Sequence, residues 1–294
     1  MATQTDPLER IHRLPCWSGK VALEPLLGGI TNKNFLVTDR AGKFVVRVGH
    51  DLPVHGVMRF NELAASRAAH AAGISPEVVY AETGVLVLRY IEGRALTAEL
   101  VRNTALLPSI VDLLKRCHEE VPRHLDGPAL MFWVFQILRG YANALREFDN
   151  PYRPLLPQLM ENAAALEQEV GAVVIVYGHN DLLAANIIDD GKRLWLIDWD
   201  YAGFNSPLFD LGGLVSNNEL DSHQTQFVLA RYFGSVDAAL QRKFDAMRCA
   251  SLLRETMWSM VSELNPQVQF DYAAYTRENL ARFRHAYDEF VEKM

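Results

Sequence analysis

The chain has 294 residues, of which 49% are hydrophobic and 22% are charged, a composition typical of a soluble globular protein rather than a disordered, collagen-like or coiled-coil chain. A chain of this length usually outgrows a single core, so we expect two lobes with a cleft between them, or one large domain. The formal net charge of −7 offers no diffuse positive field for nucleic acid. An anionic substrate would therefore need positive charge supplied locally.

The first 90 or so residues are predicted to be rich in strands. Residues 26–48 predict two strands around a turn at 39–42, which is a β-hairpin with a glycine-bearing loop. The apolar segments are 26–27, before the glycine pair, and 34–37 and 44–48 on either side of the turn. The Ala-rich stretch 60–72 predicts a helix that ends at Gly73. One further strand is expected at 85–90.

The remainder of the chain is predicted to be mainly helical. Helical periodicity occurs at 106–118, 131–146, 155–169, 224–232, 236–264 and 272–292. Two apolar runs, 172–176 and 194–197, interrupt the helices and predict strands. A hairpin turn is expected between them at 189–192.

Polar side chains follow these two apolar runs. Asp181 and Asn186 are spaced as D-x-x-x-x-N after the first run, and Asp198 directly follows the second. This order matches the phosphoryl-transfer set in which one Asp orients the attacking hydroxyl while the Asn and a second Asp hold Mg²⁺. Carboxylate and amide oxygens are ligands that Mg²⁺ prefers.

Each of these residues also has a plain structural interpretation. Asp181 could cap a helix and Asp198 could close a hairpin. The order and spacing of the set favour the chemical interpretation over the structural one. His179, just before Asp181, is expected to hold backbone through hydrogen bonds rather than to transfer protons.

The three cysteines, Cys16, Cys117 and Cys249, lie far apart and form no C-x-x-C pair. They are expected to be free thiols in a reducing compartment. The start of the chain lacks a basic segment followed by an apolar run, and no stretch reaches about 18 consecutive apolar residues. A cytoplasmic protein with no membrane partner is expected.

Around the Asp181 and Asp198 motifs the chain resembles the choline/ethanolamine kinase branch of the aminoglycoside phosphotransferase-like, protein-kinase-like superfamily. The resemblance is carried by 198–205, which is followed by Phe209-Asp210, and by the loop 28–35. It implies an α+β, two-lobed protein-kinase-like fold. Residues 1–91 would form a small nucleotide-binding β-sheet lobe with one main helix, and 92–294 a larger, mainly helical lobe that carries catalysis and substrate binding.

The resemblance also implies roles for single residues. Asp181 would be the catalytic base, and Asn186 and Asp198 the Mg²⁺ ligands. Arg47 would contact the phosphates of ATP, with its direction fixed by an ion pair to Glu62. Taken alone, Arg47 could equally be an outward strand residue and Glu62 a solvated helix charge.

The nucleotide would lie between a loop and the connection between the lobes. The loop residues implied to contact its phosphates are Gly28, Gly29, Thr31 and Asn32. The connection implied to hydrogen-bond adenine runs from Leu88 through Tyr90 to Ile91.

The alcohol substrate would lie among aromatic and acidic residues late in the chain. Trp258, Phe270 and Tyr275 fall where choline kinases surround choline with aromatic rings, and Asp200 is placed with this set. Phe270 could equally be a core residue.

Two departures from the choline kinase pattern make the cage smaller or more polar. Glu255 stands where another aromatic is often found, and Asn217-Asn218 where a Glu-Trp pair is common. An amine able to donate a hydrogen bond to Glu255 would then compete with choline. Alternatively, Glu255 pairs with Arg254 or another neighbour on the surface.

The sequence therefore predicts an ATP- and Mg²⁺-dependent kinase that phosphorylates the hydroxyl of a cationic, choline- or ethanolamine-like amino alcohol. An aminoglycoside, thiamine or other small-alcohol kinase of the same superfamily is the first alternative, and a non-catalytic nucleotide-binding pseudokinase is a remoter one. A protein kinase is disfavoured because no activation segment ending in Ala-Pro-Glu follows Asp198. The choice of alcohol, ATP or GTP, and monomer or homodimer all stay open.

Overall fold

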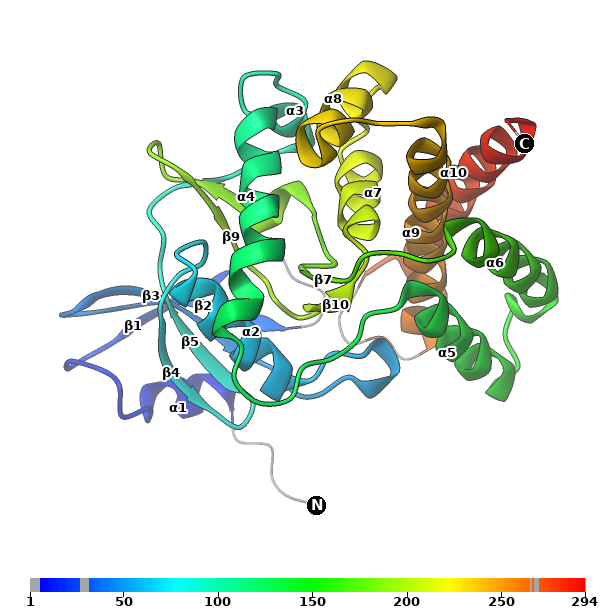
Figure 1. Cartoon of the computed structure of the whole chain (residues 1–294). Helices are drawn as coiled ribbons and strands as arrows, with labels where there is room; N and C mark the ends of the chain where they lie inside the picture. Colours follow the sequence, from blue (N-terminus) through cyan, green and yellow to red (C-terminus); the bar gives the residue numbers. More distant parts are fainter. Residues whose placement is uncertain (1–5, 27–31, 265, 267–269, 294) are drawn as a thin grey trace.

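The fold is α+β, with an antiparallel sheet at one end and a helical body at the other (Figure 1). A computed structural model describes residues 6–26, 32–264, 266 and 270–293. The sheet is followed along the chain by a mainly helical part into which two small sheets are inserted. The predicted fold class is confirmed.

The N-terminal sheet has five strands in the order β1-β2-β3-β5-β4, and all neighbouring pairs are antiparallel. The strands are β1 (Ala22–Leu26), β2 (Lys33–Asp39), β3 (Gly42–Val48), β4 (Val78–Glu82) and β5 (Val85–Arg89). Side chains alternate along β3, so that Phe44 and Val46 are buried. Arg47 follows Val46 near the end of β3, so its side chain points to the opposite face of the strand, where it is also buried.

Three helical segments accompany this sheet: α1 (Pro7–His12), the 3₁₀ turn η1 (Pro53–His55) and α2 (Arg59–Ala71). Ile11 of α1 packs with Phe44 and Val46 in a small core of the sheet. The alanines Ala65, Ala68 and Ala69 of α2 instead belong to the large core of the helical part. Helix α2 therefore bridges the sheet and the helical body, and the division at residue 91 stays a prediction.

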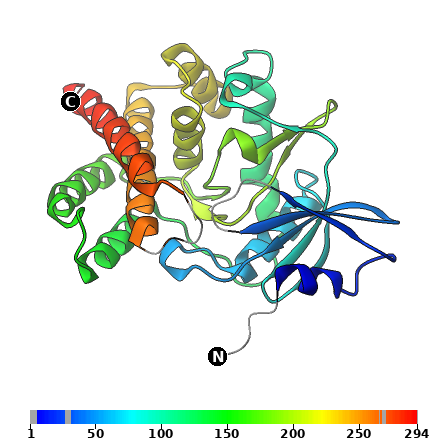
Figure 2. The same cartoon turned by 180° about the vertical axis from the view of Figure 1, so that it is seen from behind.

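Within the described residues, the helical body contains four shorter segments and seven helices of more than ten residues. The former are α3 (Ala98–Val101), η2 (Val121–His124), η3 (Arg153–Leu155) and η4 (Ala184–Asn186). The latter are α4 (Leu107–Glu120), α5 (Val134–Glu147), α6 (Leu156–Val170), α7 (Pro207–Asn217), α8 (Ser222–Phe233) and, at the end of the chain, α9 (Ala238–Leu264) with α10 (Tyr272–Glu292). Helix α9 packs against α5, α6, α7 and α10 and is buried along most of its C-terminal half (Figures 1 and 2).

Two small sheets lie between the large sheet and the helices. One pairs β7 (Val176–Gly178) with β10 (Gly203–Asn205), and the other has the order β6 (Arg94–Ala95), β8 (Ile187–Asp189) and β9 (Leu194–Leu196). The predicted hairpin turn at 189–192 joins β8 to β9. These short strands carry the polar motifs at their ends.

Three expectations differ from the structure. The run 172–176 is not a strand except at its last residue, because Val174 and Ile175 are exposed and pairing with β10 begins only at Val176. The helix expected from 131 starts at Val134, since Phe132 donates a backbone hydrogen bond to Phe204 instead. Helix α7 was not predicted, because Gly212 and Gly213 lower the helical propensity of its sequence.

None of the helices in the described residues is both long enough and apolar enough to cross a membrane.

The contact between α7 and α9 yields a stability prediction. A Cβ atom at Gly212 would lie 3.0 Å from the Cα of Arg248, whereas at Gly213 the nearest atom, Ser251 Oγ, would be 3.7 Å away. Gly212→Ala should therefore lower the free energy of unfolding by about 1–2 kcal/mol through overpacking. Gly213→Ala should be neutral or stabilise by up to about 1 kcal/mol. Urea unfolding measures both, and equal effects would contradict this packing.

Candidate active site

The segment after β7 is held by one carboxylate. Asp210, in the first turn of α7, accepts hydrogen bonds from the backbone N–H groups of His179 (2.8 Å) and Asn180 (2.7 Å). Asn180 has a positive φ of 64°, a strained conformation that these two bonds help to hold. Asp210 thereby fixes the direction in which the next residue, Asp181, leaves the backbone.

Asp210 has a histidine partner in the core. His118 Nε2 lies 2.9 Å from Asp210 Oδ2, and its Nδ1 lies 2.6 Å from the hydroxyl of Tyr232. Burial opposes ionisation of Asp210, but the hydrogen bonds from His118 and from the backbone outweigh it and lower the pKa of Asp210. The anchor is therefore an ionised, fully bonded carboxylate.

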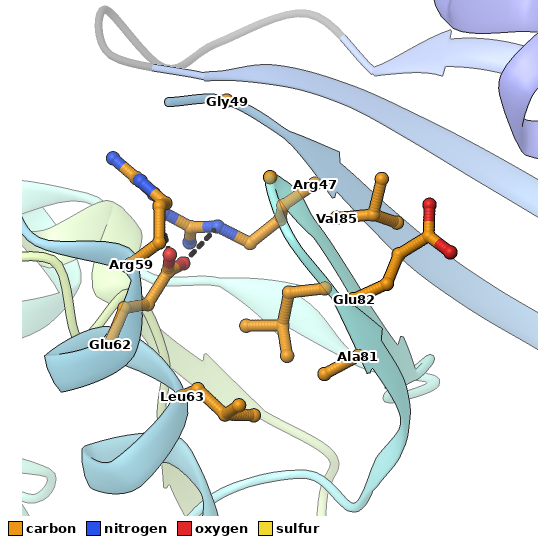
Figure 3. Close-up of a pocket in the computed structure, with 10 residues that line it drawn as sticks. Arg47, Gly49, Arg59, Glu62, Leu63, Ala81, Glu82 and Val85 are labelled. Atoms are coloured by element: carbon orange, nitrogen blue, oxygen red, sulfur yellow. Dashed lines mark hydrogen bonds and ion pairs between the residues drawn. The ribbon is translucent and has the colours of Figure 1, made fainter. Parts of the chain in front are cut away.

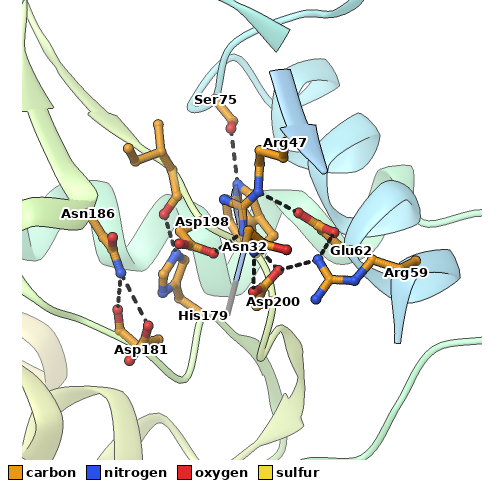
Figure 4. A network of polar contacts seen from close by, with 12 residues as sticks. Asn32, Arg47, Arg59, Glu62, Ser75, His179, Asp181, Asn186, Asp198 and Asp200 are labelled. Carbon is orange, nitrogen blue, oxygen red and sulfur yellow. Dashed lines mark hydrogen bonds and ion pairs between the residues drawn. The ribbon is translucent and has the colours of Figure 1, made fainter. Parts of the chain in front are cut away.

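The three residues predicted for catalysis and metal binding lie together (Figure 4). Asn186 Nδ2 donates to the backbone O (2.9 Å) and to Oδ2 (3.3 Å) of Asp181. The backbone N–H of Ile197 donates to the carbonyl of Asn186 at 2.9 Å, which brings the residue after it, Asp198, to the same place. Asp198 has a φ of 69°, a strained backbone of the kind found at functional sites.

His179 has the structural role that was expected. Its ring is buried, with Nε2 2.9 Å from the carbonyl of Ile197 and the ring 4.9 Å from that of Trp199. Burial lowers the pKa of His179. A neutral imidazole therefore fastens the segment before Asp181 to the segment before Asp198.

Asp181 has a raised pKa. Its side chain is half-buried, and desolvation raises its pKa to about 8 against the opposing charge of Arg254. Repulsion from Asp198 and Glu255 contributes to the same rise in the pKa of Asp181. A carboxylate with a raised pKa is a stronger proton acceptor, as a general base needs to be.

Arg47 is the centre of a buried ion network (Figure 4). Its Nε lies 2.8 Å from Glu62 Oε1, so the predicted ion pair is present. Its Nη2 lies 2.8 Å from Asp198 and 2.9 Å from Asp200. Through these contacts one side chain of β3 holds α2 and the segment after β9.

A second arginine completes the network. Arg59 Nη1 lies 2.5 Å from Glu62 and 3.1 Å from Asp200. Asn32 Nδ2 donates to the other oxygen of Asp200 at 2.9 Å. Asp200 was predicted to contact the alcohol, but it is 2% exposed and does not line the pocket beside Asp181. Its position supports an anchoring role.

The expected nucleotide contacts are described only in part. Gly28, Gly29 and Thr31 lie outside the described residues. Leu88 is in β5, while Tyr90 and Ile91 follow it, and the backbone N–H of Tyr90 donates to the carbonyl of Lys43. The contacts of this connection with adenine, and of Arg47 with phosphates, stay predictions.

A small pocket lies on the sheet side of the Arg47–Glu62 pair (Figure 3). Its wall is formed by α2 and by the strands β4 and β5, including Leu63, Ala81 and Val85. Apolar side chains therefore lie beside the Arg47–Glu62 ion pair in this pocket.

A second pocket opens beside Asp181. Glu255 and Arg254 of α9, Asn217 of α7 and Ser251 line it together with Asp181. Glu255 accepts hydrogen bonds from Arg254 Nη1 (2.9 Å) and from the Tyr275 hydroxyl (2.7 Å). Glu255 therefore lines this pocket and also pairs with Arg254, so features of both sequence interpretations of Glu255 are present together.

The three predicted aromatic residues form one cluster near this pocket. The ring centroid of Tyr275 lies 6.4 Å from that of Trp258 and 5.5 Å from that of Phe270. Trp258 is 5% exposed and donates through Nε1 to the Tyr201 hydroxyl at 2.9 Å, whereas Phe270 is 41% exposed. None of the three lines the Asp181 pocket, and Tyr275 approaches it only through Glu255.

The sequence interpretation missed four residues that shape the site. Arg59 could have been found from its i,i+3 spacing to Glu62. Asp210 was noted only as part of a signature, and Arg254 only as a neighbour of Glu255. Nothing in the sequence around His118 predicts a role in the site, because only the fold brings it next to Asp210.

The Asp210 anchor gives a pH-dependent prediction. Asp210→Asn replaces one acceptor oxygen with an N–H₂ group that faces N–H donors, so it should lower the free energy of unfolding by about 3 kcal/mol. The pKa of Asp210 is lower in the folded protein than the roughly 3.9 of an unfolded chain. The stability it contributes is therefore present at pH 7 and pH 5 and is lost as pH falls through the folded pKa.

Urea unfolding at several pH values tests this prediction. Asp112→Asn, which removes a half-exposed pair with Arg231, is the control and should cost less than about 1 kcal/mol. A deficit for Asp210→Asn that stays constant from pH 7 to below pH 4 would show that the ionised carboxylate is not the anchor.

The chain is similar to known small-molecule kinases. It is 28% identical over 264 residues to protein LicA of Haemophilus influenzae, covering 84% of this chain and 75% of that one. It is 26% identical to mouse ethanolamine kinase 2, covering 84% and 71%. The crystal structure of a choline/ethanolamine kinase family protein from Mesorhizobium loti matches with a TM-score of 0.77 at 26% identity, covering 95% and 92%.

A family model gives the broader assignment. The model described as the phosphotransferase enzyme family (APH) matches residues 22–248. That range holds the five-stranded sheet, the Arg47 network and the Asp181, Asn186 and Asp198 cluster. The chain therefore belongs to the APH phosphotransferase enzyme family.

Proposed function

We propose that the protein is a Mg²⁺- and ATP-dependent kinase that transfers the γ-phosphoryl group to the hydroxyl of an amino alcohol of the choline or ethanolamine kind. The observation that carries the proposal is the shared site of Asp181, Asn186 and Asp198, with Asp181 facing a pocket lined by Glu255. Membership of the phosphotransferase family supports the reaction class. Similarity to ethanolamine kinase 2 and LicA supports the choice of acceptor class.

In this mechanism each residue has one task. The Asp181 carboxylate accepts the proton of the acceptor hydroxyl as its oxygen bonds to the γ-phosphorus, and ADP leaves with the electrons of the broken bond. Glu255, supported by Tyr275, faces the amine of the acceptor. Arg47 would contact the phosphates of ATP, with Arg59 beside it in the same ion network.

The metal would be held by Asn186 and Asp198. Their amide and carboxylate oxygens suit Mg²⁺, which when bound neutralises charge on the phosphates. Among the described residues no group of three or more His, Cys, Asp or Glu side chains is arranged to hold a metal ion. The protein would thus supply few ligands, and phosphate oxygens and water the rest, as is usual for Mg²⁺ with nucleotides.

The first test removes the proposed base. Asp181→Asn should lower kcat by roughly 10²-fold or more while MgATP affinity changes little, because the base acts in the transition state. A coupled ADP assay with choline, ethanolamine, thiamine and an aminoglycoside identifies the acceptor, and calorimetry measures nucleotide binding. Asp288→Asn, on the exposed face of α10, is the control. Unchanged turnover of every accepted substrate in Asp181→Asn would overturn the mechanism.

The second test concerns the metal. Asp198→Ala should weaken ATP binding in the presence of Mg²⁺ by roughly tenfold or more and should change metal-free binding less, since it removes a proposed ligand. Calorimetric titration of ATP into the protein, once with Mg²⁺ and once with EDTA, measures the metal-dependent and the metal-free affinity separately. Equal affinity with and without Mg²⁺ in the unmodified protein would contradict the metal assignment.

A further inference from the structure

Arg254 is a buried cation in a pocket proposed to receive a cation. It lies on α9 one residue before Glu255, is 4% exposed and lines the pocket beside Asp181. Its guanidinium carbon lies 4.3 Å from the ring centroid of Tyr201, so the group is stacked and held in one orientation. A choline-like acceptor would bring a second positive charge close to Arg254, and the two like charges would repel each other.

Within the described part of the chain, a carboxylate pairs with only one edge of this guanidinium. Nη1 donates to Glu255 at 2.9 Å. Nε and Nη2 are buried and have no hydrogen-bond partner of acceptable geometry in the described part of the chain. The neutral Tyr141 hydroxyl lies close enough to interact with the guanidinium as a hydrogen-bond partner, and it also lies 3.2 Å from His55 Nδ1. A buried cationic edge beside a neutral hydroxyl and without a carboxylate is only partly compensated, so an anionic ligand would stabilise it.

The geometry of the unused edge indicates which ligand fits. Nε and Nη2 form the side of an arginine that binds a carboxylate through two parallel hydrogen bonds, as Arg231 does with Asp112 on the surface of this protein. The nearby carboxylates do not fill this role at Arg254. Glu255 is bound by Nη1 and by Tyr275, and Asp181 is held by Asn186.

We propose that Arg254 binds a carboxylate carried by the acceptor, so that the preferred acceptor is a zwitterionic hydroxyamino acid rather than a simple amino alcohol. This inference rests on the proposed kinase function and narrows its substrate class. The amine would face Glu255, the carboxylate the Nε and Nη2 edge of Arg254, and the hydroxyl Asp181. The pocket then pairs each charge of the acceptor with an opposite charge.

The test compares acceptors that differ by one carboxylate. L-Serine is ethanolamine with a carboxylate added, and L-homoserine bears the same relation to 3-amino-1-propanol. In the unmodified protein, kcat/KM should favour the carboxylated member of each pair by about tenfold or more. Arg254→Gln should lower kcat/KM for the carboxylated members by about 10–10²-fold, the range expected for two charge-assisted hydrogen bonds, and change the others less than about threefold.

Two further variants separate recognition from folding. Arg254→Lys keeps the charge without the two-pronged edge and should give an intermediate loss. Arg242 lies on α9 like Arg254, but it is half-exposed and pairs with Glu169. Arg242→Gln should leave kcat/KM unchanged for both pairs of acceptors. If thermal melting shows that Arg254→Gln does not fold, Arg254→Lys carries the comparison.

Three results would overturn the inference. The first is a higher kcat/KM of the unmodified enzyme for ethanolamine and 3-amino-1-propanol than for their carboxylated counterparts, and the second is an equal loss of kcat/KM for both members of each pair in Arg254→Gln. The third, where only Arg254→Lys folds, is that this variant keeps the full preference for the carboxylated acceptors. An equal loss would mean that Arg254 acts on Asp181 through its charge. If no acceptor is phosphorylated although MgATP binds, the proposed function fails instead. Calorimetry then compares L-serine with ethanolamine, where stronger binding of L-serine supports the inference and equal or weaker binding overturns it.

Discussion

The structure depends on the ion network around Arg47. One guanidinium from β3 contacts Glu62 of α2 and both Asp198 and Asp200, which follow β9. These groups come from parts of the chain that share no local sequence pattern. Removing one partner from such a buried set leaves an uncompensated charge, at a cost of about 3–5 kcal/mol. The network therefore sets the position of the sheet relative to the polar cluster.

The remaining geometry follows from two further anchors. Asp210 holds the backbone before Asp181, and His179 ties that backbone to Ile197 before Asp198. The wall of the Asp181 pocket that carries Arg254 and Glu255 belongs to α9, a helix packed against four others. Two buried arginines in the Arg47 network and a third, Arg254, on α9 thus lie among carboxylates in a chain of net charge −7.

Sequence reasoning reached the residues whose chemistry is encoded locally. Asp181, Asn186 and Asp198 follow short apolar segments at informative spacing. The Arg47–Glu62 pair was implied by the family resemblance, because each of the two residues taken alone has a plain structural interpretation. It failed where the meaning of a residue arises from tertiary contact. The surroundings of Arg254 and the anchoring role of Asp200 depend on residues distant in sequence. The glycines of α7 lower the helical propensity of a segment that packs closely on α9.

The central claim is that this site transfers a phosphoryl group from a nucleotide to an alcohol. Its most direct test is to incubate the protein with Mg²⁺, an accepted hydroxyl compound and ATP whose terminal phosphoryl group carries ¹⁸O on its non-bridging oxygens, and to analyse the products by mass spectrometry. The account predicts a phosphate ester in which all the labelled oxygens are retained and the bridging oxygen is the unlabelled oxygen of the acceptor. Labelled inorganic phosphate alone, with the acceptor unmodified, would contradict it.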